Sequence, residues 1–270
     1  MAVAGAATVS IIEGHTVAEI GRNANINQGS GSTGATQDVV VQAHTNGLTV
    51  DTAVGFTGGT VGVGAAVDVA MIDKTTQAKI GYGATVSAAR NIEVKADNED
   101  TLVGVVASMA VGTTSAGVSG AVGVAVLSNK AAAFVESAPD AAHAARLTAG
   151  ATSGNIKVEA DNTSRVYHVA GSMGLGKYAG AGIGVSVVSA QTTTRAALGD
   201  YTIADAGKSV DVSADADTRL VSVTVAAGGG LVGVAGGISV KSMKTDTKAE
   251  IGANAKVNQN NTTNTPTDQT

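Results

Sequence analysis

Residues 67–81 read VDVAMIDKTTQAKIG, and a phrase of the same length and pattern occurs five times along the chain. The other copies are ATVSIIEGHTVAEIG (7–21), VGVAVLSNKAAAFVE (122–136), VSVVSAQTTTRAALG (185–199) and ISVKSMKTDTKAEIG (238–252). Their starts, at residues 7, 67, 122, 185 and 238, lie 53 to 63 residues apart. A period of this length indicates repeated units that stack on their neighbours.

A second phrase lies between the copies of the first: VVVQAHTNG (39–47), IEVKADNED (92–100), IKVEADNTS (156–164) and VDVSADADT (210–218). Its alanines, Ala43, Ala96, Ala160 and Ala214, keep step with the first phrase. Two markers in the same order predict about four and a half units. We expect a repeat domain over residues 1–257 and a polar, disordered tail over 258–270.

Each unit has the pattern of β-strands. From Val61 to Met71, every second residue is Val, Ala or Met, and the same alternation occurs over 103–111 and 221–225. This period of two predicts strands, and Val, Ile and Thr favour pleated surfaces. The sequence therefore predicts an all-β parallel β-solenoid (a β-helix), with coils about 4.8 Å apart. The alternative, an antiparallel sandwich, predicts frequent turn signals without the long repeat.

The length of the unit predicts a flattened shape. Each unit exceeds the 20–30 residues of a simple coil, and the surplus is rich in Gly, Ala and Val. We expect this surplus to run out and back as a flattened wing whose two sheets approach closely. One stretch, 137–146, differs: Ser137 can cap a helix, Pro139 suits its first turn and the alanines favour it. We predict a helix of one or two turns there.

Composition excludes several classes of protein. The chain has 270 residues, 36 Gly, 2% aromatic and 14% charged residues, a net charge of −5 and no Cys. It lacks the charge of disordered chains and the basic, aromatic surface of nucleic-acid binders. No apolar run is long enough to predict a membrane-spanning helix. The absence of Cys favours export, and the first residues lack the basic segment of a signal peptide, so we expect a piece of a longer chain.

The candidate site residues are acidic. Asp97, Asp161 and Asp215 follow the aligned alanines, and in a solenoid they would form a column, which we expect at a corner. Stacked carboxylates could bind Ca²⁺, but the favoured interpretation is an Asx-turn at each corner, with no metal. The four histidines, His15, His44, His143 and His168, show no metal-ligand spacing. We expect them to be scattered surface or loop residues.

The sequence predicts neither catalysis nor a cofactor. Glycine runs such as 228–230 lack the Lys-Ser/Thr of a phosphate-binding loop. The tyrosines Tyr82, Tyr167, Tyr178 and Tyr201 are dispersed and are not accompanied by an acid pair. We therefore expect a protein that is not an enzyme.

Two stretches, TTQAKIGYGATVSAARNIEVKADNED (75–100) and TKAEIGANAKV (247–257), resemble repeats of large bacterial surface proteins. These are the filamentous-haemagglutinin-like and leukotoxin-type adhesins, and the resemblance covers roughly residues 4–257. It implies type V secretion, a rod anchored at the outer membrane, and contact with host or neighbouring cells. The third unit departs from the pattern, because Glu136 stands where Gly21 and Gly81 occur, so its corner should differ.

Three functions are compatible with these observations. The first is a structural stalk segment of a secreted cell-surface adhesin, with loops 27–38 and 137–148 varying on its surface. The second is a glycan-, ion- or receptor-binding module that uses those insertions or the aspartate column. The third is a self-assembling extracellular filament subunit, because a solenoid exposes unpaired strand edges at its ends.

Overall fold

The chain coils into a parallel β-solenoid with two sheets of long strands and one of short strands. The computed structural model describes residues 1–28 and 36–259. Sheet A contains β1 (Ala2–Ile20), β4 (Gly62–Ile80), β7 (Ala116–Val135), β10 (Ala179–Leu198) and β13 (Val232–Ile251). Sheet C contains β3 (Val39–Gly59), β6 (Ile92–Gly112), β9 (Asn155–Gly176) and β12 (Ser209–Gly229). Sheet B contains the short strands β2 (Asn25–Ile26), β5 (Thr85–Ser87), β8 (Arg146–Thr148), β11 (Ile203–Asp205) and β14 (Lys256–Val257).

Neighbouring coils pair in parallel with equivalent residues side by side. Ala7, Val67, Val122, Val185 and Ile238, the first residues of the five phrases, form one row across sheet A. The four alanines of the second phrase form one row across sheet C. The register confirms the predicted parallel β-solenoid.

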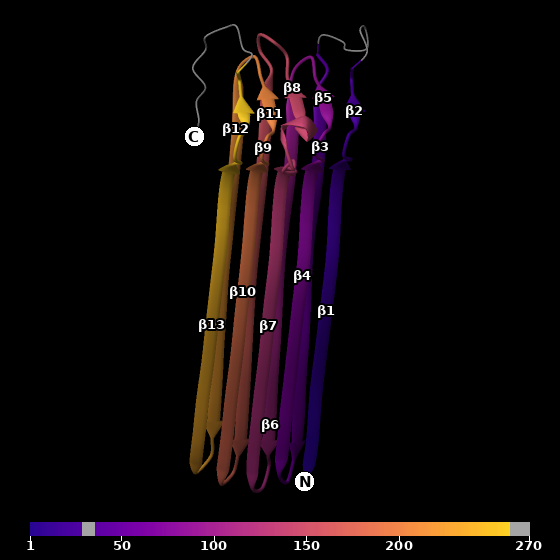
Figure 1. Ribbon diagram of the computed structural model, residues 1–270. Coiled ribbons are helices and arrows are strands. Elements are labelled where there is room, and N and C mark those ends of the chain that lie inside the picture. The colour runs from indigo at the N-terminus through magenta and orange to yellow at the C-terminus, as the bar shows by residue number, and fades with distance from the viewer. Residues whose placement is uncertain (29–35, 260–270) are drawn as a thin grey trace.

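The solenoid has the shape of a flat blade (Figure 1). Sheets A and C form its two faces, and their long strands run along its length. At one end, which we call the tip, short turns connect sheet C to sheet A. At the other end, the base, sheet B separates the two long sheets and gives the coil a third side. The predicted flattening is confirmed, but the wing is no separate unit, because each strand runs unbroken from base to tip.

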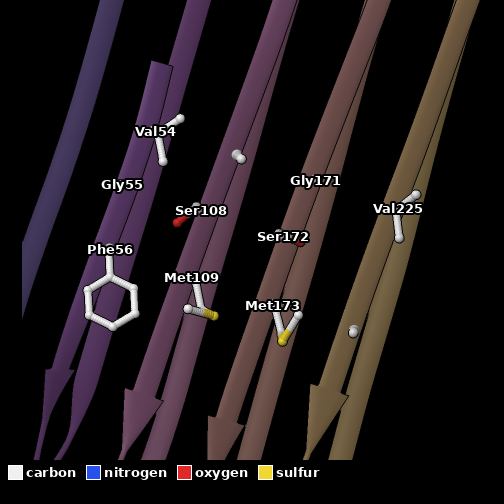
Figure 2. Close-up of a pocket in the computed structure, with 11 residues that line it drawn as sticks. Val54, Gly55, Phe56, Ser108, Met109, Gly171, Ser172, Met173 and Val225 are labelled. Carbon is white, nitrogen blue, oxygen red and sulfur yellow. The ribbon is translucent and has the colours of Figure 1, made fainter. Parts of the chain in front are cut away.

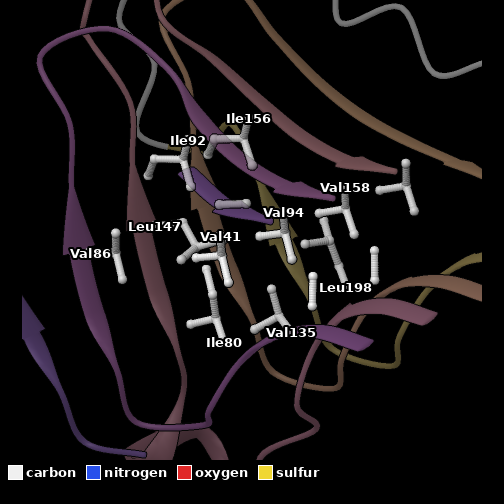
Figure 3. Close-up of a cluster of buried hydrophobic side chains, with 14 of the residues drawn as sticks. Val41, Ile80, Val86, Ile92, Val94, Val135, Leu147, Ile156, Val158 and Leu198 are labelled. Carbon is white, nitrogen blue, oxygen red and sulfur yellow. The ribbon is translucent and has the colours of Figure 1, made fainter. Parts of the chain in front are cut away.

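The apolar core is largest at the base, where sheet B closes the coil (Figure 3). Each coil contributes Ile, Leu and Val side chains to stacked rows, among them Ile80, Val135 and Leu198 from sheet A. A second cluster lies midway along the blade around Leu102, Leu127 and Val166. Towards the tip the core consists mainly of alanine. Stacked rows of identical shape bury each coil against the one before, which explains how a chain without bulky residues forms a core.

In four of the five coils, the turn from sheet A into sheet B contains one residue in the left-handed region. Asn23, Gly83, Tyr201 and Asn254 hold φ values of 57°, 71°, 61° and 57° at this turn. Asn and Gly tolerate this conformation better than other residues. A Cβ on Gly83 would lie 2.2 Å from Oδ1 of Asn23 in the coil before, so close stacking also favours glycine here.

In the tip half of the blade, small residues point inward and larger apolar residues point outward. Gly62, Gly64 and Ala66 are buried, whereas Val63 and Val67 alternate with them on the outer face. The inward glycines bring the two sheets into backbone contact: a Cβ on Gly117 would lie 2.1 Å from the carbonyl oxygen of Leu175. The blade is therefore thin at its tip, as the Gly/Ala content predicted.

The predicted helix between 137 and 146 is a single 3₁₀ turn, η1 (Ala141–His143). Asp140, not Ser137, caps it, and its Oδ1 accepts hydrogen bonds from the amides of Ala142 (2.9 Å) and His143 (3.1 Å). The chain must join β8 at Arg146, which leaves no room for a second turn. The predicted insertion of one or two turns is thus a single turn, and the prediction that Ser137 caps it is wrong.

Two other predictions fall largely outside the described residues. These are the loop within 27–38, of which 29–35 lies outside, and the tail, of which 260–270 lies outside. The predicted start of the tail, Asn258, belongs to the ordered fold: its Oδ1 accepts a hydrogen bond of 2.7 Å from the amide of Ala206. The third corner differs as expected, because Glu136 forms ion pairs with Arg22 (2.7 Å) and Lys79 (3.6 Å).

Two glycines of β9 provide a matched test of the close approach between the sheets. A Cβ on Gly174 would lie 2.0 Å from the carbonyl oxygen of Ala181, whereas a Cβ on Gly171 would meet nothing within 4 Å. We expect Gly174→Ala to lower the free energy of unfolding by about 2 kcal/mol or more, because backbone cannot yield as a side chain does. Gly171→Ala should leave it unchanged or raise it by up to about 1 kcal/mol. Urea unfolding of both variants measures the difference, and equal effects would contradict this account of the packing.

Candidate functional site

A row of polar residues crosses the interior between the middle cluster and the tip. Sheet A contributes one position per coil and sheet C contributes the facing position. The members are Thr8, Asp68, Gly123, Ser186 and Ser239 from sheet A, and Asp51, Gly104, His168 and Ser222 from sheet C. We call these residues the inner polar row. The row contains three buried titratable side chains: Asp51, Asp68 and His168.

His168 is the centre of the inner polar row and is 1% exposed. Its Nδ1 lies 2.8 Å from Oγ of Ser186, which lies 2.8 Å from Oγ of Ser222. Ser222 continues the chain of hydroxyls to Ser239 at 2.9 Å. On the other side, Nε2 lies 3.7 Å from Oδ2 of Asp68, and both side chains are fully buried. The row thus joins coils through side chains as well as through backbone.

Two glycines make room for the imidazole ring. A Cβ on Gly123 would lie 2.0 Å from Cε1 of His168, and a Cβ on Gly104 would lie 2.6 Å from Cδ2. Gly104 occupies the equivalent position in the coil before His168. A histidine inside the thin part of the blade is therefore possible only because two of its neighbours in the row, Gly104 and Gly123, have no side chain.

Burial shifts both titratable groups of this site towards their neutral forms. Desolvation, with a smaller contribution from the nearby Asp51, raises the pKa of Asp68 from its ordinary value of 3.8 to about 6. Desolvation lowers the pKa of His168. Both oxygens of Asp68 and Nε2 of His168 have no hydrogen-bond partner, which accounts for the cost of charging them.

Ser186, His168 and Asp68 are the residue types of a hydrolytic triad, but their setting does not support catalysis. Ser186 and Asp68 are 0% exposed, so a substrate could reach the hydroxyl only if the two sheets separated. At 3.7 Å, Asp68 also forms no hydrogen bond that would orient the imidazole. In this geometry the group links coils and fixes their register.

The expectation that all four histidines lie on the surface or in loops is wrong for His168. The sequence carried a signal that points inward: His168 shares strand parity with Val166 and Ala170, which are also buried. His15 and His143 are exposed, and Nδ1 of His143 lies 2.7 Å from Oδ1 of Asp140.

A second set of buried polar residues lies between the base core and the middle cluster. Nδ2 of Asn98 donates to Oδ1 of Asn162 at 3.2 Å, and Oγ1 of Thr76 donates to Oγ1 of Thr45 at 2.8 Å. Nζ of Lys74 contacts Oδ1 of Asp100, whose side chain is 1% exposed. Stacked amides and paired charges satisfy one another in a buried setting, and a shift of register would leave them unpaired.

The aspartate column exists, but it lies in the middle of the strands rather than at a corner. Asp97, Asp161 and Asp215 form one row on the outer face of sheet C, and His44 extends it by one coil. The alternation that turns Ala96 inward turns Asp97 outward, so the expected corner and its Asx-turn are wrong. Calcium binding by this column stays the alternative to the favoured interpretation of no metal.

Neighbouring charges already engage part of the column. Nδ1 of His44 lies 3.1 Å from Oδ2 of Asp97, and Nζ of Lys95 lies 2.9 Å from Oδ2 of Asp161. Within residues 1–28 and 36–259, no group of three or more His, Asp or Glu side chains is placed to hold a metal ion.

The corner around Glu136 forms a small polar cleft of about 280 Å³. The guanidinium of Arg22 lies 4.6 Å from the ring centre of Tyr82 and donates to both oxygens of Glu136, at 2.7 and 3.3 Å. These hydrogen bonds lower the pKa of Glu136. Arg195, also in the cleft, pairs with Glu250 at 2.5 Å. Each charged side chain that lines the cleft thus has a partner of opposite charge.

In the described part of the chain, no helix has the length and apolar character needed to cross a membrane. Comparison with known proteins found no matching family model, no matching curated protein and no matching solved structure.

The pKa of Asp68 makes a testable prediction about pH. Because its pKa in the folded state exceeds the unfolded value, Asp68 favours folding below about pH 4, and that contribution is lost as the pH rises through about 6. We expect Asp68→Asn to unfold with a free energy close to that of the wild type at pH 4. At pH 7 the variant should be more stable by about 3 kcal/mol.

Urea unfolding between pH 4 and pH 7 measures this difference, in which the other titrating groups cancel. Asp73→Asn serves as the control, because Asp73 is exposed on the outer face of the same strand. A stability difference for Asp68→Asn that does not change with pH would show that the pKa of Asp68 is the same in the folded and the unfolded chain.

Proposed function

We propose that this chain is a structural stalk segment of a secreted bacterial cell-surface adhesin, which gives the adhesin reach and rigidity. The observation that carries the proposal is the unshifted register: every residue of β4 from Gly62 to Ile80 pairs with its equivalents in both neighbouring coils. A structure whose coils are interchangeable can be lengthened by adding units without changing its cross-section.

Side chains inside the blade oppose sliding of one coil past another. The inner polar row and the Asn98–Asn162 pair match one coil with the next, and the buried Lys74–Asp100 pair joins the two long sheets within one coil. A slip of one residue would turn these groups outward and bring the outer residues into the core. Resistance to slipping is the property that a load-carrying stalk needs.

The cellular setting of the proposal rests on sequence. The repeat phrases resemble filamentous-haemagglutinin-like and leukotoxin-type adhesins, and the absence of Cys is compatible with export by a type V route. We infer an extracellular location on the bacterial surface and contact with host or neighbouring cells. Surface labelling of intact cells of the source bacterium with an antibody against residues 1–270 tests the location.

A second candidate function is a filament subunit that assembles end to end. It is favoured by the edge strands of the first and last coils in the stack, which pair on one side only. These strands are β1 and β3 in the first coil, and β12 and β13 in the last. Such edges are templates for strand addition. Proline at alternate positions of β12 and β13 would block this assembly, whereas a stalk segment does not depend on these edges.

Deletion of one complete unit tests the stalk directly. Removing residues 122–184 joins Ala121 to Val185, which occupies the same row as Val122, so the remaining coils keep their register. We expect a folded chain, shorter by about 4.8 Å along the axis. Its thermal unfolding should stay cooperative, with a midpoint within about 10 °C of the wild type. Circular dichroism measures both properties.

Removing residues 122–153 serves as the control. This deletion joins sheet A to the strand that belongs in sheet C, so the chain would re-enter the stack in the wrong sheet, and we expect loss of cooperative unfolding. If the two deletions behaved alike, the interchangeable coils on which the proposal rests would be refuted. Binding on a glycan array, or a Ca²⁺-dependent rise in melting temperature, would instead favour a binding module.

A further inference from the structure

The outer faces of the tip half are apolar on both sides of the blade. On sheet C, five consecutive outward rows begin at Val50, Thr52, Val54, Phe56 and Gly58 of β3, and none of their members is charged. In order, the rows are Val50, Val103, Tyr167 and Val221; Thr52, Val105, Val169 and Val223; Val54, Ala107, Gly171 and Val225; Phe56, Met109, Met173 and Ala227; and Gly58, Val111, Leu175 and Gly229. On sheet A, the matching rows begin at Val3, Gly5, Ala7, Val9 and Ile11 of β1 and contain Val, Ala, Gly, Ile, Met and two serines. We call these surfaces flank C and flank A.

Charge separates the flanks sharply from the base half of the blade. No position of either flank carries a charge, whereas the outer rows on the base side contain residues such as Glu13, Asp73, Lys95 and Arg165. Exposure confirms that nothing in the described chain covers the flanks: Phe56 is 61% and Ile183 is 54% exposed. A boundary this sharp is typical of an interaction surface rather than of scattered surface apolar residues.

The size of each flank matches a specific protein interface. With a rise of about 3.3 Å per residue and about 4.8 Å between strands, a flank measures roughly 33 Å by 19–24 Å, on the order of 600–800 Å². The largest apolar patch of a typical monomer covers about 300–600 Å², and stable complexes bury about 800 Å² on each partner. Each flank therefore offers nearly the area of a complete interface.

The relief of flank C suits another sheet. A shallow groove of about 320 Å³ follows the row that contains Ala107 and Gly171, and Phe56, Met109 and Met173 form the ridge beside it (Figure 2). Groove and ridge lie two residues apart along the strands. If two copies of flank C face each other with their strands reversed, the ridge of each copy lies opposite the groove of the other.

We propose that second copies of this chain stack face to face through flanks A and C. Only another sheet repeats with both spacings of this surface, the distance along the strands and the distance between them. The small inward residues keep the blade thin, so each layer presents an apolar flank on both sides. The charged base halves stay outside the stack.

Two pairs of substitutions test the proposal. Val169→Lys with Met173→Lys places charge on flank C at positions that are 41% and 39% exposed. Val67→Lys with Val122→Lys does the same on flank A, at 38% and 39% exposure. The matched control, Gln77→Lys with Thr163→Lys, adds the same charge to the outer faces of the base half. Far-UV circular dichroism and thermal unfolding check that each variant is folded.

Analytical ultracentrifugation between 1 and 100 μM gives the expected results. The wild type and the control should form species of at least twice the monomer mass of 26.2 kDa, increasing with concentration. A variant blocked on one flank should stop at the dimer if like flanks pair, or at the monomer if flank A pairs with flank C. The variant that carries all four flank substitutions should be a monomer in either case.

Other results would overturn the proposal. A wild type that is monomeric at 100 μM has no stacking interface of this kind. Assembly that persists in the four-substitution variant but is lost when proline blocks β12 and β13 would show end-to-end association, which is the filament candidate above. Flotation of a monomeric wild type with phosphatidylcholine vesicles, lost in the four-substitution variant, would assign the flanks to lipid. None of these outcomes depends on the proposed stalk function, which the unit deletion tests separately.

Discussion

The structure depends on one constraint: each residue stacks on its equivalent in the neighbouring coil. Parallel strands in unshifted register place equivalent positions about 4.8 Å apart, so each side chain must fit against its equivalents in the one or two adjacent coils. Rows of Ile, Leu and Val meet this constraint at the base, where sheet B supplies a third wall. Rows of glycine and alanine meet it at the tip, where two sheets lie in backbone contact.

This constraint also explains why polar groups can be buried in so thin a molecule. The amide of Asn98 is satisfied by the equivalent amide of Asn162 in the next coil, and the imidazole of His168 occupies the space that Gly104 and Gly123 leave. Asn162 and Gly104 each lie in the same row as the residue that they accommodate, one coil away, and Gly123 lies in the facing sheet. The rows that cost the most to desolvate are therefore also those that specify the register most strongly.

Much of the fold could be predicted from sequence, because the repeat is a pattern of spacing and spacing determines register. The alignment of Ala7 with Val67 and Val122, and of Ala96 with Ala160, is the alignment found in the sheets. The direction in which each row points could not be predicted in the same way. A period of two shows that alternate residues share a face but does not show which face is buried.

The errors follow from this ambiguity. The aspartate column was expected at a corner because Asp and Asn favour turns, but Asp97 continues the strand parity of its neighbours and lies on an outer face in mid-strand. His168 was expected on the surface, although it shares the parity of Val166 and Ala170. Hydrophobicity gives the correct face at the base, where the larger residues are inside, and gives the opposite answer at the tip.

The inversion at the tip connects the packing of the blade with its surface. Two sheets can lie in backbone contact only if the inward residues are small, so the β-branched residues that favour a strand must occupy the outward positions. The glycines that make the blade thin thus leave Val67, Val122 and their equivalents facing solvent on both sides. A solenoid with a wide interior would bury such residues within one chain. In a thin blade they can be buried only between chains, so the apolar flanks are a direct consequence of the same small residues that close the core.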